Sequence, residues 1–163
     1  MTRTTSQPQG GFTLLELMIV VAVIAILASI SIPYFYGQII RGQIVDSMSL
    51  AEVAKRAVSA VYTATGKLPE NNEAASIPVS DKMVGNYVTR VEVIDGAITL
   101  TFGNNSHKQI AGKQLTLRPA IVADSPQVPI AWVCAARAVP NGMAAIGQDR
   151  TSIPVGWLPF NCR

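Results

Sequence analysis

The 163-residue sequence contains few of the residues that build catalytic or metal sites: it has one histidine, His107, and two cysteines, Cys134 and Cys162. Neither cysteine has another cysteine or a histidine at metal-ligand spacing. No nucleophile lies at a recognised spacing from a base, and Gly10-Gly11 is too short for a phosphate-binding loop. We therefore expect no catalytic residue, no metal site and no cofactor, and we place His107 in a solvated loop.

Aromatic residues make up only 6% of the chain, charged residues 14%, and the net charge is +3. Binding of nucleic acid requires a basic stripe or patch, usually with aromatic residues on which bases stack. Lys108, Lys113 and Arg118 are close in sequence but have no aromatic residues between them. We expect no nucleic-acid site, and we interpret Trp132 and Trp157 as packing residues.

Charge is missing altogether from Leu17 to Ile40, a run of 24 residues. About 20 apolar residues cross a bilayer as a helix, so this run is long enough for a membrane span. It is too long for the apolar core of a secretory signal, which has about 7–15 residues. Glu16, at its start, would cost roughly 3 kcal/mol to insert into lipid. A plain membrane anchor leaves that glutamate unexplained.

Residues 11–17, which read GFTLLEL before the apolar run, resemble the leader junction and N-terminal helix of type IV pilins and pseudopilins. The resemblance implies that residues 1–11 form a leader, which prepilin peptidase removes by cutting after Gly11. It also implies methylation of the new N-terminal amine of Phe12. That amine then lies one helical turn from Glu16 and can neutralise it. The resemblance implies that the pair forms between neighbouring subunits and sets their register.

Pro33 lies inside the apolar helix, where it removes a backbone N–H and crowds the Ser29 carbonyl, so we expect a kink. The hydroxyls of Ser29 and Ser31 are expected to help satisfy the freed backbone groups. In pilins that this chain resembles, the stretch before this proline unwinds during assembly. We expect the same for residues 25–32.

We expect a hydrophobic helix over residues 12–40 and a head domain over 41–163. The helix continues over 41–65, where Glu52 and Arg56 are spaced to pair, and Gly66 and Pro69 end it. A long loop follows at 67–86. One face of the second half is apolar at spacings of three and four and is expected to pack on a sheet: Ile40, Ile44, Met48, Ala51, Ala54, Val58 and Val61.

The sheet is expected over about residues 87–135, starting with a hairpin at 87–103 around a type I′ turn at Asp95-Gly96. Further strands are expected at 114–121 and 130–135. The fold class is α+β: a long N-terminal helix packed on a four-stranded antiparallel sheet, as in the pilin αβ-roll. The apolar hairpin residues are Val88, Val91, Val93, Ile98, Leu100 and Phe102.

Cys134 and Cys162 bound a segment rich in proline and glycine. They could be free thiols in a cytosolic protein, but a domain exported behind a membrane segment lies in an oxidising compartment. We therefore predict a Cys134–Cys162 disulfide that pins a loop over 134–162 to the sheet edge. The bounded C-terminal loop resembles that of Gram-negative major pilins.

The predicted function is a structural subunit, not an enzyme. The family resemblance implies a prepilin in the inner membrane and an assembly machinery there. It also implies an extracellular filament of identical subunits used in adhesion, twitching motility and possibly DNA uptake. A minor pilin or type II secretion pseudopilin is one alternative. A membrane-tethered periplasmic binding domain, with an uncut N-terminus, is another.

Overall fold

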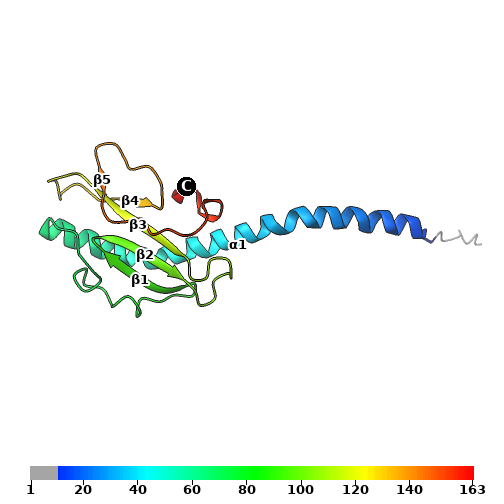
Figure 1. The fold of residues 1–163 in the computed structure, drawn as a ribbon, viewed down its shortest axis with the longest axis horizontal. Helices are drawn as coiled ribbons and strands as arrows, with labels where there is room; N and C mark the ends of the chain where they lie inside the picture. Colours follow the sequence, from blue (N-terminus) through cyan, green and yellow to red (C-terminus); the bar gives the residue numbers. More distant parts are fainter. Residues whose placement is uncertain (1–10) are drawn as a thin grey trace, which may run out of the picture. The chain divides into compact units, whose positions relative to one another are not determined.

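The computed structural model describes residues 11–163, with the backbone alone at residues 32–34, and Figure 1 shows its fold. The chain divides into two compact units between Tyr36 and Gly37. A long helix, α1 (Leu14–Thr65), supplies the whole of the described first unit apart from residues 11–13, and it continues into the second. The predicted leader, residues 1–11, lies outside the described residues except for Gly11.

In the second unit, the predicted apolar face of α1 is buried against the sheet in one hydrophobic core. Alanine at two of these positions lets the helix approach the sheet closely, and Met48 packs at the edge of the core. The last buried position is Tyr62, with Val61 only half-buried. The helical residues with no exposed surface are Ile40, Ile44, Ala51, Ala54 and Val58.

The sheet is antiparallel, in the order β1-β2-β3-β4, with a further strand β5 beside β3. The strands are β1 (Val88–Ile94), β2 (Ala97–Phe102), β3 (Gln114–Ile121), β4 (Ala131–Cys134) and β5 (Ala144–Ala145). The first four confirm the predicted sheet. Strand β5 was not predicted, and its residues were expected to be loop, because two alanines carry no pattern of alternation.

The hairpin between β1 and β2 has the predicted turn. Asp95 and Gly96 both adopt positive φ, 49° and 78°, as a type I′ turn requires. All six apolar residues predicted for the two strands are buried. Pairing of Val91 with Leu100 aligns their side chains on the face that α1 covers.

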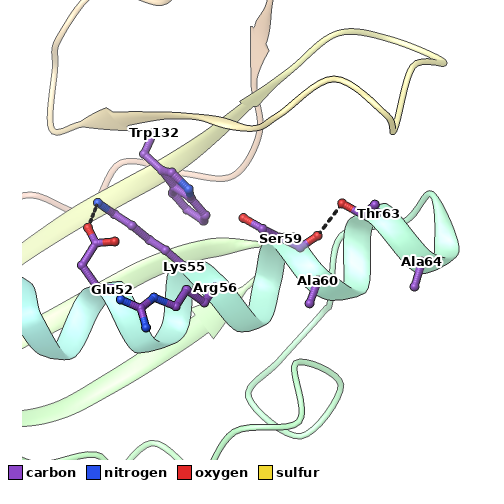
Figure 2. A pocket seen from close by; sticks show the side chains of 8 residues that line it. All are labelled: Glu52, Lys55, Arg56, Ser59, Ala60, Thr63, Ala64 and Trp132. Atoms are coloured by element: carbon purple, nitrogen blue, oxygen red, sulfur yellow. Dashed lines mark hydrogen bonds and ion pairs between the residues drawn. The ribbon is translucent and has the colours of Figure 1, made fainter.

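Helix α1 ends as predicted at Gly66, which has φ +72° and donates its N–H to the Tyr62 carbonyl at 2.8 Å. The predicted ion pair of Glu52 with Arg56 is wrong. Glu52 instead accepts a bond from Lys55 at 2.7 Å, and Figure 2 shows Lys55 reaching along the helix to it. The Lys55 ammonium also lies 6.0 Å from the ring of Trp132, which places it between the carboxylate and the sheet.

The connection at residues 67–86 contains one buried polar side chain, Asn72, which bonds to the sheet. Its amide nitrogen donates to the carbonyls of Pro78 (2.9 Å) and Val91 (3.0 Å). Its amide oxygen accepts from the Val93 N–H at 2.7 Å. The loop is therefore tied to β1 by these side-chain hydrogen bonds as well as by backbone bonds, such as the one from the Val91 N–H to the Ser80 carbonyl at 3.2 Å.

The C-terminal segment follows β4 and is closed by a disulfide between Cys134 and Cys162, whose Cα atoms are 4.7 Å apart. Two short 3₁₀ turns, η1 (Val155–Trp157) and η2 (Phe160–Cys162), precede the C-terminus. Both tryptophans pack at the edge of the core, as predicted. His107 lies in a loop, as predicted, and is half-buried; its backbone N–H donates to the Gln43 side chain at 2.8 Å.

Candidate functional site

The candidate site lies where α1 begins, in the first unit. Gly11 and Phe12 precede the helix without regular structure, and both are exposed, Phe12 by 85%. Thr13 is the N-cap: its carbonyl accepts the N–H of Leu17 at 3.2 Å, so helical hydrogen bonding starts there. The predicted cleavage junction is thus an exposed strip of chain directly before the first helical turn.

Thr13 and Glu16 form a capping box. The Thr13 hydroxyl accepts the Glu16 N–H at 3.2 Å, while Glu16 Oε2 accepts the backbone N–H and the hydroxyl of Thr13, both at 3.4 Å. This role of Thr13 was not predicted from the sequence. The signal was present, because threonine followed three residues later by glutamate, before an apolar run, is the pattern of a helix start.

The carboxylate of Glu16 is held loosely by these bonds. Charge-assisted hydrogen bonds are usually about 2.7–2.9 Å long, so contacts of 3.4 Å are weak. Of the two carboxylate oxygens of Glu16, Oε2 accepts hydrogen bonds, and Oε1 accepts none from the described residues. The helix dipole favours a negative charge in the first turn. The site therefore presents a pre-placed anion with one oxygen available to an external cation.

In the uncleaved chain, the nitrogen of Phe12 belongs to the Gly11–Phe12 peptide bond and carries no charge. The predicted partner of Glu16, a Phe12 amine, arises only after cleavage at that bond. Phe12 and Glu16 are four residues apart, about one helical turn, and their ion pair stays a prediction.

Apart from Glu16, the part of α1 in the first unit carries no charged side chain and is apolar on every face. Its large side chains from Leu14 to Ile30 are each exposed by between 48% and 78%. Among the described residues, α1 is the one helix that is long and apolar enough to cross a membrane. A helix that is apolar on every face requires lipid or other apolar helices around it.

The side chain of Pro33 lies outside the described residues, so its proposed role there stays a prediction. The backbone is helical through this position. The hydroxyls of Ser29 and Ser31 donate to the carbonyls of Ile26 (2.7 Å) and Leu27 (3.0 Å). They therefore do not satisfy the Ser29 carbonyl that the proline leaves free, because each bonds to the turn preceding its own position.

Comparison with known proteins agrees with this geometry. Residues 6–32 match the prokaryotic N-terminal methylation motif, and residues 40–163 match the pilin family of bacterial filament proteins. The chain belongs to the pilin family. It is 39% identical to a type IV major pilin protein, PilE1, of Neisseria gonorrhoeae, over 95% of this chain and 87% of the relative. It is 36% identical to a fimbrial protein of Neisseria meningitidis serogroup A, over 95% and 94%.

More distant similarity extends to fimbrial protein Q of Moraxella bovis, at 31% identity over 91% of this pilin and 96% of the relative. Pilins are structural proteins of filaments, and the chain is a structural subunit, not an enzyme. The start of α1 brings together a peptide junction, a helix cap and one carboxylate.

Proposed function

We propose that this pilin is the major subunit of a type IV pilus and is made as a prepilin in the inner membrane. Prepilin peptidase cuts after Gly11, and the new amine of Phe12 is methylated. The match of residues 6–32 to the methylation motif supports this processing, as does the exposed junction before α1. Relatives that span nearly the whole chain are named major pilins or fimbrial proteins, which favours the major subunit.

Assembly then pairs the Phe12 amine of an incoming subunit with Glu16 of a subunit already in the filament. The observation that carries this step is the half-satisfied carboxylate: Thr13 positions Glu16 through Oε2, and Oε1 accepts no bond among the described residues. A cation at Oε1 neutralises a charge that otherwise costs roughly 3 kcal/mol in apolar surroundings. Removing one partner of such a buried pair costs about 3–5 kcal/mol.

The apolar part of α1 passes from lipid into a bundle of the same helices from other subunits. Its side chains are exposed on every face of the isolated chain, so both environments bury a similar surface. The helix around Pro33 loosens over residues 25–32 to fit the bundle. One head-to-tail contact, repeated with a rise and a rotation, gives an extracellular helical filament. Its tasks are adhesion, twitching motility and possibly DNA uptake, with an inner-membrane assembly machinery as partner.

The test combines a mass measurement with a substitution. The mature chain is expected to begin at Phe12 with one added methyl group. Glu16→Ala is expected to keep cleavage and membrane insertion but to lose most of the sheared surface filament. Glu73→Ala, which removes an exposed carboxylate with no side-chain bond among the described residues, is the matched control and should assemble normally.

Three outcomes contradict the proposal in different ways. Normal filament yield from Glu16→Ala excludes the register pair. An uncut, unmethylated chain indicates a membrane-tethered periplasmic domain. Deletion of the gene that stops protein secretion but leaves surface filaments intact indicates a pseudopilin or minor pilin.

A further inference from the structure

The C-terminal segment of the second unit is surrounded by three arginines that bond to its backbone. Arg41, on α1, donates to the Gly156 carbonyl at 2.8 Å, and Arg163 donates to the same carbonyl at 2.8 Å. Arg163 also donates to the Leu158 carbonyl at 2.9 Å. Arg137 donates to the Asn161 carbonyl at 3.0 Å. Figure 1 shows the C-terminus, in red, beside α1.

These guanidinium groups have neutral acceptors only. Among the described residues, the ion pairs of the protein involve other cations, namely Lys55, Arg90 and Arg150. Arg41 also has a buried Nε atom without a hydrogen-bond partner. Because each guanidinium carries five N–H donors, most of the donors here have no acceptor within the part of the chain that the structure describes. The cluster therefore offers N–H donors that no acidic side chain occupies, which suits an anionic ligand.

Two carboxylates lie in the same region, and neither pairs with an arginine of the cluster. Asp149 lines a pocket together with Arg163, and its Oδ1 accepts the Thr151 N–H at 2.9 Å. Asp46 is exposed on α1, more than one turn beyond Arg41. The three guanidinium groups thus stand against two side-chain carboxylates, and the terminal carboxylate of Arg163 adds a third negative group. The cations are matched in number but not paired, because these guanidinium groups form no ion pair among the described residues.

Apolar side chains project beside the charges. Phe160 is exposed by 85% and Val155 by 61%, one in each of the two 3₁₀ turns. The Cys134–Cys162 disulfide fixes the second turn to β4. An exposed apolar ring next to arginines, on a fixed loop, suits a membrane interface, where the ring enters the boundary of headgroups and acyl chains and the cations meet phosphates.

The position of Arg41 in the chain decides the occupant. It is the first charged residue after the apolar run that ends at Ile40. When that run spans a bilayer, Arg41 is held by the covalent chain at the headgroup layer, and the segment bonded to it is held there too. A tethered surface meets its ligand at a high effective concentration. A neighbouring pilin has no such fixed proximity before assembly.

We propose that Arg41, Arg137, Arg163 and the segment 153–163 form a headgroup-docking surface that binds anionic phospholipids while the prepilin is in the membrane. This inference rests on the proposed membrane-inserted precursor. Docking seats the head domain on the bilayer surface, and these contacts must break when the subunit leaves for the filament. The disulfide loop then has a role before assembly as well as within the finished subunit.

Trp157 lies inside the proposed surface and is one of two tryptophans in the chain. Full-length Trp132→Phe protein, reconstituted into vesicles, therefore reports on this surface alone. The vesicles contain phosphatidylcholine, or an equimolar mixture with phosphatidylglycerol, each with a brominated lipid as quencher. We expect stronger quenching of Trp157 in the anionic vesicles and a loss of that difference at high salt, where the Debye length falls to about 3 Å.

The variants give the size of the effect. Each of Arg41→Gln and Arg163→Gln is expected to lower the docking equilibrium by about fivefold, the effect of one basic residue near an anionic surface. Phe160→Ser is expected to reduce quenching in both vesicle types. Lys67→Gln is the matched control. It removes an exposed cation two residues after the C-terminal end of α1, and the variant should behave like the parent.

Amide exchange of residues 153–163 in the unsubstituted chain, in both vesicle types, gives a second measurement that does not depend on replacing Trp132. Slower exchange in anionic vesicles supports the proposal. If neither quenching nor amide exchange differs between the two vesicle types, the proposal is overturned. Quenching that depends on protein concentration instead overturns it in favour of contact with a second copy.

Co-flotation of the chain with vesicles separates the two levels of inference. A chain that does not float with lipid contradicts the membrane-inserted precursor itself. A chain that floats, but whose Trp157 is not quenched in either lipid, contradicts only the docking surface.

Discussion

Replacing Asn72 tests how the 67–86 loop is held. Its side chain is buried and makes three bonds at 2.7–3.0 Å: two donated to carbonyls and one accepted from Val93. Asn72→Ala removes all three and leaves the Val93 N–H without its acceptor in a buried strand. Each lost bond costs about 0.5–1.5 kcal/mol, and a stranded buried group about 1–3 kcal/mol. Because water can reach some of the freed groups, we expect a total loss of about 3 kcal/mol.

The assay is thermal and denaturant unfolding of the disulfide-intact chain in detergent, followed by circular dichroism. For a domain of this size, about 1 kcal/mol corresponds to roughly 3–5 °C in Tm, so the expected drop is about 10–15 °C. Asn71→Ala is the matched control. Asn71 is the adjacent residue and is exposed, and its side chain accepts one bond, from the Ala74 N–H at 2.8 Å.

We expect Asn71→Ala to cost about 0.5 kcal/mol, since water replaces its partner. If the two variants unfold within about 0.5 kcal/mol of each other, the loop is not held by Asn72, and its position follows from the hydrophobic contacts around it. Faster amide exchange in residues 70–80 of Asn72→Ala, with unchanged exchange in β3, would locate the effect in the loop.

Three further predictions concern the helix start, the disulfide and the hairpin turn. Thr13→Ala is expected to destabilise the first turn of α1 by about 1 kcal/mol and speed amide exchange there, whereas Thr13→Ser keeps the hydroxyl; equal exchange in the two contradicts the capping box. Cys134→Ser is expected to cost roughly 3.5 kcal/mol of unfolding free energy, and the gap to the parent should vanish in reductant. Gly96→Ala forces a side chain to φ +78° and places its Cβ 3.0 Å from the Leu68 side chain, while Gly66→Ala has similar φ and open space. In unfolding assays, backbone strain should lower the free energy of unfolding of each variant by about 1–2 kcal/mol. The contact with Leu68 should make the loss larger for Gly96→Ala. Equal losses in the two variants would show that the Leu68 side chain moves aside.

Local sequence signals predicted those elements whose stabilising interactions are close in sequence. The Asp95-Gly96 turn requires positive φ at two successive residues, and few residue pairs allow that. Once the turn is placed, alternation of apolar residues fixes both flanking strands. The strand at 114–121 was predicted with the bounds that the structure shows. The capping box of Thr13 and Glu16 was equally local and was overlooked.

Interactions that depend on partners far along the chain could not be predicted this way. Asn72 looked like one more polar loop residue, and its role depends on strand β1, 19 and 21 residues away. The choice of Lys55 over Arg56 as partner of Glu52 depends on side-chain directions around the helix. Both lie within reach in sequence, and only the packed structure places Lys55 between Glu52 and Trp132.

The sequence by itself determined that this protein has a membrane-length apolar helix with one acid at its start, followed by an α+β head. Those properties follow from the order and spacing of side chains along a single helix and hairpin. Only the tertiary structure decided that Arg41 and Arg163 converge on the Gly156 carbonyl. Residues more than 100 positions apart meet there because the core packs α1 against the sheet and the disulfide returns the chain end to it. No local pattern encodes that meeting.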